Sequence, residues 1–111
     1  MQRTILITDA MSAAGSIDGM YTIGGLDVEV KDSIARLVHN GSLAGSTLTM
    51  EKAFLNFMKK DGVSIIDAVH ASSTLPAKIL GLEKVGTIAI GNKANILHFD
   101  GEKIDLLIFE S

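Results

Sequence analysis

One carboxylate stands out in this sequence because of its position. Asp9 directly follows residues 4–8, a Thr-Ile-Leu-Ile-Thr run without polar alternation. Such a run is typical of a strand covered on both faces. In barrels of parallel strands, an Asp at the C-terminal end of a strand points into the mouth of the active site. The same side chain could instead cap a turn by accepting hydrogen bonds from backbone N–H groups. The residues alone leave both interpretations open.

A glycine-rich segment at residues 41–47, Gly-Ser-Leu-Ala-Gly-Ser-Thr, precedes a helical pattern. Small residues let backbone N–H groups approach a ligand, and the N-terminus of a helix favours an anion or a carbonyl oxygen. The segment lacks the Lys that a P-loop has before its Ser or Thr. A tight connection between a strand and a helix explains the same composition, and the composition alone favours this simpler interpretation.

The three histidines are spread over the chain. His39 falls in a predicted loop, His70 in a predicted helix and His98 in a predicted strand. None of them has the H-x-H or H-E-x-x-H spacing of a metal site. We therefore expect no metal to be held from within this chain. We expect His39 to be solvated, His70 to be partly packed and His98 to point outward.

The elements that position these residues are strands first and helices later. Short alternating runs between residues 20 and 38 predict two or three strands of an antiparallel meander. From residue 50 the period changes to that of a helix, with Met50, Phe54, Phe57 and Met58 expected in the core.

Two further helices are indicated after Gly62. One is capped by Ser64, with Asp67 three residues later, and is expected to end near residue 71. The other covers residues 76–80, with Pro76 at its start and a glycine beyond its end.

The remaining chain is β-like. Residues 86–91 indicate a strand or an extended turn, and residues 94–99 and 103–109 predict a hairpin around Asp100-Gly101. Because the three helices are consecutive, the pattern shows no repeated βαβ units. The chain taken alone is predicted to be α+β.

Composition excludes several classes of protein. The chain has 111 residues, 47% of them hydrophobic and 21% charged, which is typical of a globular domain. A net charge of −3 without a basic cluster argues against nucleic-acid binding. No apolar run approaches the roughly 20 residues of a membrane span, and no signal peptide is visible. Cysteine is absent, which excludes disulfides and fits a reducing cytoplasm, where we expect the protein to reside.

The order of the segments is more specific than any one of them. It resembles the N-acetylglucosamine-6-phosphate deacetylase family, and its closing part is similar to amidohydrolases in general. The segments that carry the resemblance are Leu-Ile-Thr-Asp-Ala-Met at 6–11, Asp-Gly-Met-Tyr at 18–21, Gly-Gly at 24–25, residues 41–50, Ser-Thr-Leu-Pro-Ala-Lys at 73–78, and residues 86–91 and 93–97.

The resemblance implies a particular fold. Members have a TIM-type (β/α)8 barrel with a small appended β domain, and such a barrel takes about 250 residues. Residues 1–81 would be the C-terminal portion of the barrel, with residues 4–8 as its last strand. Residues 82–111 would belong to the appended domain. The family's metal-binding and phosphate-binding residues would precede this chain.

The resemblance also implies a reaction. Members use a divalent metal, Zn or similar, to remove acetate from N-acetylglucosamine 6-phosphate. The family's catalytic Asp matches Asp9, which would serve as base and then as acid. Its sugar-site stretch matches Leu43, Ala44 and Gly45. A homo-oligomer is expected, and the isolated chain is expected to be inactive. The alternative is a truncated, non-catalytic module that self-associates through an exposed barrel edge.

Overall fold

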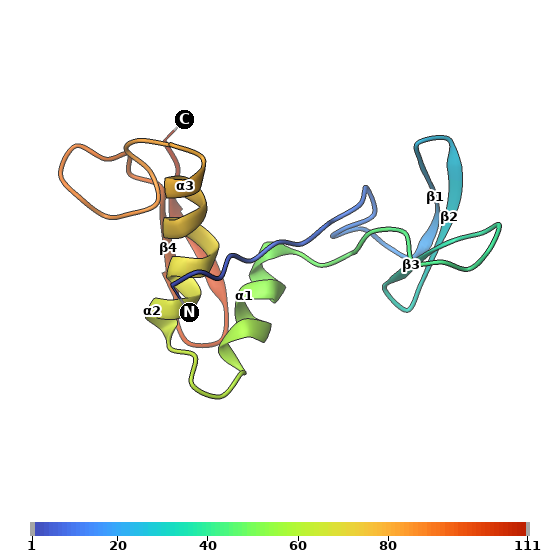
Figure 1. The fold of residues 1–111 in the computed structure, drawn as a ribbon, viewed down its shortest axis with the longest axis horizontal. Coiled ribbons are helices and arrows are strands. Elements are labelled where there is room, and N and C mark those ends of the chain that lie inside the picture. Colours follow the sequence, from blue (N-terminus) through green and yellow to red (C-terminus); the bar gives the residue numbers. More distant parts are fainter. Residues whose placement is uncertain (1, 111) are drawn as a thin grey trace. The chain divides into compact units, whose positions relative to one another are not determined.

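The computed structural model describes residues 2–110, which fall into two compact units. One unit is formed by residues 7–53 and the other by residues 2–6 with residues 54–110. Strands and helices are both present, which confirms the α+β expectation (Figure 1). The described residues form a three-stranded and a two-stranded sheet, so this part of the chain closes no barrel by itself.

The unit of residues 7–53 is built around an antiparallel meander. Its strands are β1 (Gly19–Ile23), β2 (Leu26–Lys31) and β3 (Ile34–Leu37), in that spatial order. Both connections are two-residue turns. Gly24-Gly25 and Asp32-Ser33 all have positive φ, which is the geometry of a type I′ turn. The meander predicted between residues 20 and 38 is therefore confirmed.

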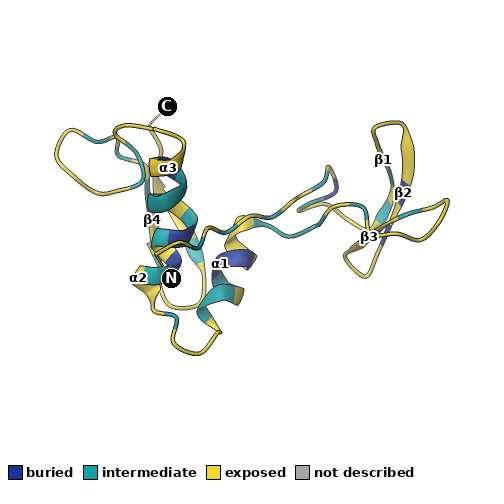
Figure 2. Cartoon of the chain, viewed as in Figure 1, coloured by how far each residue is buried: buried dark blue, intermediate teal, exposed yellow. Residues whose placement is uncertain are grey.

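The core of this unit lies under β2 and β3. Alternation along β2 buries Val28 and Val30, whereas the residues between and beside them face solvent (Figure 2). Ala13 and Ala35 complete this buried cluster. Four partly buried side chains pack against it, namely those of Met11, Tyr21, Leu37 and Ala44. The loops around residues 11 and 44 therefore rest on a packed base.

Helix α1 (Met50–Met58) follows the glycine-rich segment. The Thr49 hydroxyl accepts a hydrogen bond from the Lys52 N–H at 3.3 Å, as an N-cap side chain does. Phe54 is buried as expected. Its ring packs edge to face against the ring of Phe99, with the two ring centroids 5.4 Å apart. The expectation that Met50 lies in the core is wrong. It is 41% exposed, because it occupies the first position of the helix, before the buried face is established.

Helical structure then continues from residue 65 to residue 79. It consists of α2 (Ile65–Val69), a π turn η1 (His70–Thr74) and α3 (Leu75–Ile79). The cap predicted at Ser64 is confirmed as a complete capping box with Asp67. The two predicted helices are thus joined, whereas the sequence indicated a break between them.

The C-terminal hairpin is formed by β4 (Ile96–Phe99) and β5 (Ile104–Ile108). Its turn is held by the Asp100 carboxylate, which accepts hydrogen bonds from the N–H groups of Glu102 and Lys103, each at 2.9 Å. These two hydrogen bonds lower the pKa of Asp100, and the bond from the Lys103 N–H has the larger effect. Residues 86–91 form no strand. They contain bends and a turn, so of the two predicted possibilities, a strand or an extended turn, the structure has the turn.

The predicted strand at residues 4–8 is not formed in this structure. A strand requires a neighbouring strand for its ladder of hydrogen bonds, and no strand among residues 2–110 pairs with this segment. Its Leu6 N–H donates instead to the carbonyl of Ala71, a helical residue, at 2.9 Å. Burial still alternates along the segment, with Ile5 and Ile7 exposed. No helix among residues 2–110 is long and apolar enough to cross a membrane.

Candidate functional site

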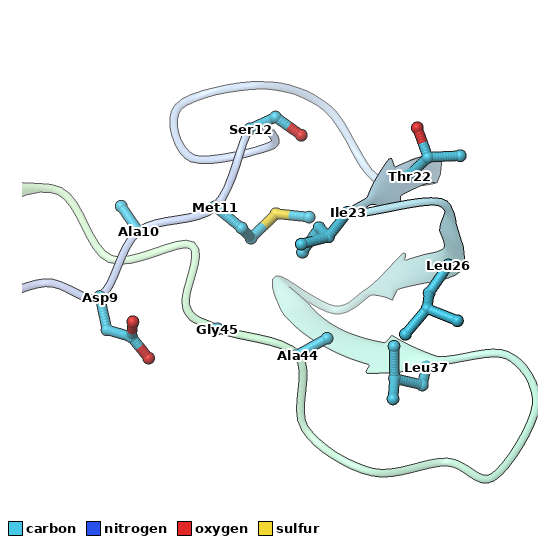
Figure 3. A pocket seen from close by; sticks show the side chains of 10 residues that line it. All are labelled: Asp9, Ala10, Met11, Ser12, Thr22, Ile23, Leu26, Leu37, Ala44 and Gly45. Carbon is cyan, nitrogen blue, oxygen red and sulfur yellow. The ribbon is translucent and has the colours of Figure 1, made fainter.

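A pocket of about 500 Å³ lies within the unit of residues 7–53 (Figure 3). Its volume is in the range of small-molecule sites. Most of its wall is apolar, and Asp9 supplies the only carboxylate among the lining residues. The lining comes from the segment after residue 8, the hairpin end of β1 and β2, the end of β3 and the glycine-rich segment: Asp9, Ala10, Met11, Ser12, Thr22, Ile23, Leu26, Leu37, Ala44 and Gly45.

Asp9 is held by its backbone and leaves its side chain exposed. Its φ of 51° lies in the left-handed region, which Asp tolerates better than most residues. The Asp9 carbonyl accepts a hydrogen bond from the Ser46 N–H at 2.9 Å, and the Met11 N–H donates to the Ser46 carbonyl at 2.8 Å. Within residues 2–110 the Asp9 carboxylate itself accepts no hydrogen bond, so the side chain caps nothing there and can act on a ligand.

The glycine-rich segment meets the Asp9 segment at Gly45. A Cβ on Gly45 would lie 3.2 Å from the Asp9 carbonyl oxygen and 3.3 Å from the Cβ of Met11. Gly45 also has a φ of 72°. Both the backbone conformation and the close approach therefore require glycine at this position. On the other side, the Ala44 N–H donates to the Ala35 carbonyl at 2.9 Å, which ties the segment to β3.

Three of the four site residues expected from the sequence come together around this pocket. Asp9, Ala44 and Gly45 all line it, although more than thirty residues separate Asp9 from Ala44 in the chain. Leu43 does not line it; its side chain is 67% exposed, and its backbone bridges to Arg36 of β3. The roles assigned to these residues stay predictions.

Sequence reasoning missed the apolar part of the wall. Met11 extends its side chain toward Ile23, and Leu26 and Leu37 complete that side (Figure 3). One signal could have indicated two of these residues. Ile23 and Leu26 flank the Gly-Gly turn, and a two-residue turn places them opposite each other at the end of a hairpin.

The described residues do not provide a metal site. Among residues 2–110 no three His, Asp or Glu side chains lie close enough together to hold an ion. The histidines stand as expected, with His39 and His98 exposed and His70 half-buried. The divalent metal implied by the resemblance therefore has no set of ligands among residues 2–110.

Comparison with known proteins gives a consistent result over almost all of the chain. Residues 3–111 match the profile of the Amidohydrolase family. The N-acetylgalactosamine-6-phosphate deacetylase of Escherichia coli O157:H7 is 40% identical over 100 residues, which are 89% of this chain and 26% of that protein.

Two solved structures of N-acetylglucosamine-6-phosphate deacetylases are also similar. The enzyme from Thermotoga maritima is 42% identical, with a TM-score of 0.78 over 96% of this chain and 27% of its own. An aspartate-to-alanine mutant of the Mycobacterium smegmatis enzyme, solved with N-acetyl-D-glucosamine-6-phosphate, is 35% identical, with a TM-score of 0.85 over 96% of this chain and 29% of its own. The chain thus spans between a quarter and a third of the length of these relatives.

Proposed function

Because the chain belongs to the amidohydrolase family, we propose that it is the C-terminal segment of a deacetylase that acts on N-acetylglucosamine 6-phosphate. The observation that supports this most strongly is the meeting of Asp9, Ala44 and Gly45 around one pocket. Family resemblance assigns these positions without reference to the geometry, and Asp9 lies far from Ala44 and Gly45 in the sequence.

In this proposal Asp9 carries a proton between two steps. Water attacks the acetyl carbonyl while the Asp9 carboxylate accepts a proton from that water. When the C–N bond breaks, the same proton passes to the departing nitrogen, which is a poor leaving group unless it is protonated. Acetate and glucosamine 6-phosphate result. The exposed carboxylate, without a hydrogen-bond partner in residues 2–110, is free to approach both atoms.

The glycine-rich segment forms the wall for the sugar in this proposal. Leu43, Ala44 and Gly45 would contact the pyranose, and the backbone at Gly45 can approach it closely because no side chain intervenes. The ligands of a divalent metal, Zn or similar, would come from polypeptide outside this chain. When bound, such a metal would polarise the acetyl carbonyl and activate water.

The name of one relative favours a second candidate substrate, N-acetylgalactosamine 6-phosphate. The Escherichia coli relative is named for N-acetylgalactosamine 6-phosphate, which differs from the glucosamine compound only in the configuration at C4. Both substrates share the acetamide that Asp9 would act on. We therefore propose the glucosamine compound as substrate and treat its galactosamine epimer as the alternative that the assay distinguishes.

The proposal is tested with a chimera in which this chain replaces the matching C-terminal part of the Thermotoga maritima enzyme. We expect zinc-loaded chimera to release acetate from N-acetylglucosamine 6-phosphate faster than from its epimer. The isolated chain, assayed in parallel, should release none. A folded chimera that releases acetate from neither compound would refute the deacetylase proposal, and a preference for the epimer would reverse the substrate assignment.

Self-association is the second candidate function. It is supported by apolar side chains that remain uncovered, among them Ile7 at 72% and Ile88 at 87% exposure. Segment 4–8 adds backbone groups that can pair with another strand. In this alternative the chain is a non-catalytic module, and a homo-oligomer is its functional state.

A further inference from the structure

The turn between β2 and β3 has a left-handed backbone without containing glycine. Asp32 and Ser33 have φ values of 52° and 62°. Asn-Gly and Asp-Gly are the sequences that favour a two-residue turn of this type, and Ser at its second position is unfavourable. Such a backbone persists when the surrounding structure holds it. We therefore looked for the groups that hold this turn in place.

The Asp18 carboxylate holds the turn from one side. Its two oxygens accept separate hydrogen bonds, one from the Asp32 N–H at 2.9 Å and one from the Ser33 N–H at 3.3 Å. Successive N–H groups in a turn form a concave site for a negative charge, and a hydrogen bond to an ionised acceptor is stronger than one between neutral groups. A single side chain thus satisfies both donors of the turn.

On its other side the turn contacts the end of the glycine-rich segment. The Ser33 carbonyl accepts a hydrogen bond from the Thr47 hydroxyl. Thr47 directly follows Ser46, whose N–H donates to the Asp9 carbonyl at 2.9 Å and whose carbonyl accepts from the Met11 N–H at 2.8 Å. The backbone at Asp9 and just beyond it is therefore paired with the residue next to Thr47.

Asp18 itself is fixed by contacts that do not involve the turn. Ala13 is buried in the core, and its N–H donates to the Met11 sulfur at 3.1 Å. Further along the same loop, the Tyr21 hydroxyl donates to the carbonyl of Ile17, the residue just before Asp18. All of these residues belong to the compact unit of residues 7–53. The contacts thus form a closed circuit that begins and ends at the Asp9 segment.

We infer that Asp18 is a positioning residue for Asp9, acting through the Asp32-Ser33 turn and Thr47. The inference rests on the proposed role of Asp9. The left-handed backbone of Asp9 sets the direction of its carboxylate, and the two hydrogen bonds to Ser46 keep that backbone in place. Asp18 does not line the pocket, so it acts on the reaction only through this circuit.

Amide hydrogen exchange on the 111-residue chain tests the circuit. Asp18→Asn keeps the shape of the side chain but places an NH₂ group where one N–H of the turn needs an acceptor. We expect the exchange protection of the Ser46 amide to fall at least about 10-fold, while that of Val28, at the centre of the meander, falls by less than about two-fold. Asp27→Asn, which removes an exposed carboxylate from β2, is the matched control and should change neither value.

A rescue separates action through the turn from any other role of Asp18. Asp32→Asn together with Ser33→Gly gives the turn the sequence that prefers its conformation, and the carbonyl that Thr47 contacts is retained. Added to Asp18→Asn, these paired substitutions should return the Ser46 protection to within about two-fold of its original value. Thr47→Val removes the hydroxyl and should lower the same protection, and the paired substitutions should not restore it.

The effect on the reaction is measured in the chimera with the Thermotoga maritima enzyme. Asp18→Asn should lower kcat at least about 10-fold, because a small displacement of a catalytic group lowers the rate steeply. KM should stay within about three-fold, because Ala44 in the sugar wall keeps its own hydrogen bond to Ala35 of β3. The paired substitutions in the turn should restore kcat.

Each outcome either supports or overturns the inference. Unchanged Ser46 protection in Asp18→Asn or in Thr47→Val overturns it, and so does a failure of the paired substitutions to rescue Asp18→Asn. If Asp18→Asn does not fold, the same chain with the paired substitutions decides, because an unfolded chain there shows that the turn is not what Asp18 supports.

Failure of this inference is distinguishable from failure of the proposed function. An active chimera whose kcat is unaffected by Asp18→Asn overturns the positioning role and leaves the deacetylase proposal standing. A folded chimera that releases no acetate refutes the proposed function, and the exchange measurements still decide whether Asp18 holds the Asp9 backbone.

Discussion

At Asp9 the backbone conformation restricts which substitutions are informative. A φ of 51° is accessible to Asp and Asn but is unfavourable for Ala. Asp9→Ala would therefore combine loss of the carboxylate with backbone strain. Asp9→Asn keeps the left-handed conformation and the size of the side chain, but removes its charge and its ability to carry a proton. The asparagine variant is for this reason the one that isolates the chemistry.

Gly45→Ala should destabilise the chain more than the same change at Gly41. Both glycines have nearly equal φ, 72° and 74°, so each alanine costs about 1–2 kcal/mol for its left-handed conformation. Only at Gly45 does the new Cβ also press on the Asp9 carbonyl and on Met11, whereas at Gly41 it meets nothing within 4 Å. Urea denaturation of the two variants measures the difference. Equal losses in the free energy of unfolding would show that the close approach at Gly45 is not maintained in solution.

Leu43→Ala should act on substrate binding rather than on turnover. A sugar-wall contact is made in the ground state and in the transition state alike, so its loss raises KM and leaves kcat nearly unchanged. The assay is acetate release by the chimera with N-acetylglucosamine 6-phosphate. Because Leu43 is largely exposed here and lies outside the pocket lining, an unchanged KM would remove it from the sugar site.

The candidate site was predictable only where local signals exist. Asp9 could be identified because it ends an apolar run, and the 41–47 segment because of its glycines. The wall residues Met11 and Leu37 could not, because isolated apolar residues give no sign of whether they face a core or a ligand. Their placement depends on strand register, which brings together residues that are remote in sequence.

Among the secondary-structure elements, the capping box of α2 gives a pH prediction. Hydrogen bonds from the Ser64 backbone and then from its side chain lower the pKa of Asp67. A carboxyl group whose pKa is lowered by folding stabilises the folded state at pH values above its unfolded pKa, near 3.9. That stabilisation is lost as the pH falls through the folded pKa. The thermal midpoint of the chain should therefore exceed that of Asp67→Asn at pH 7, and the gap should narrow as the pH falls below the unfolded pKa and through the lower folded pKa.

Ser64→Ala is the matched control for this prediction. The serine hydroxyl accepts from the Asp67 N–H at 3.1 Å, while the Asp67 carboxylate accepts from the Ser64 N–H at 2.9 Å. Since the two side chains act as one box, removing the serine should reduce the same pH dependence. A gap between the chain and Asp67→Asn that is constant from pH 7 to pH 3 would contradict the account of the cap.

The elements with short-range signals were predicted well from the sequence. Gly-Gly at 24–25 and the alternation on either side of it are sufficient for the hairpin, and Ser64 with Asp67 is sufficient for the start of a helix. The π turn was not predicted, because Pro76 is equally compatible with a new helix start, and only the position of the Leu75 N–H distinguishes the two. The strand expected at 4–8 depends on neighbouring strands that residues 2–110 do not supply.

At the scale of the whole molecule, apolar surface remains uncovered and should drive association. Burying such surface contributes roughly 25 cal/mol per Å², which is sufficient for copies to associate when several aliphatic side chains come together. We expect light scattering at high micromolar concentration to show species larger than a monomer. Ile7→Lys should shift the distribution toward monomer. Ile17→Lys should not, because Ile17 is also largely exposed, at 83%, but lies outside segment 4–8. A clean monomer for the unmodified chain would count against the self-association candidate.

The central claim is that this chain supplies the proton-carrying carboxylate of a deacetylase, and one measurement tests it most directly. That measurement is kcat for acetate release from N-acetylglucosamine 6-phosphate by the chimera, with and without Asp9→Asn, on preparations whose thermal midpoints are also recorded. General acid–base groups contribute about 10²–10⁴ to the rate, so kcat and kcat/KM should fall together by that factor while the midpoint stays the same. Near-normal kcat in the Asp9→Asn chimera would contradict the claim.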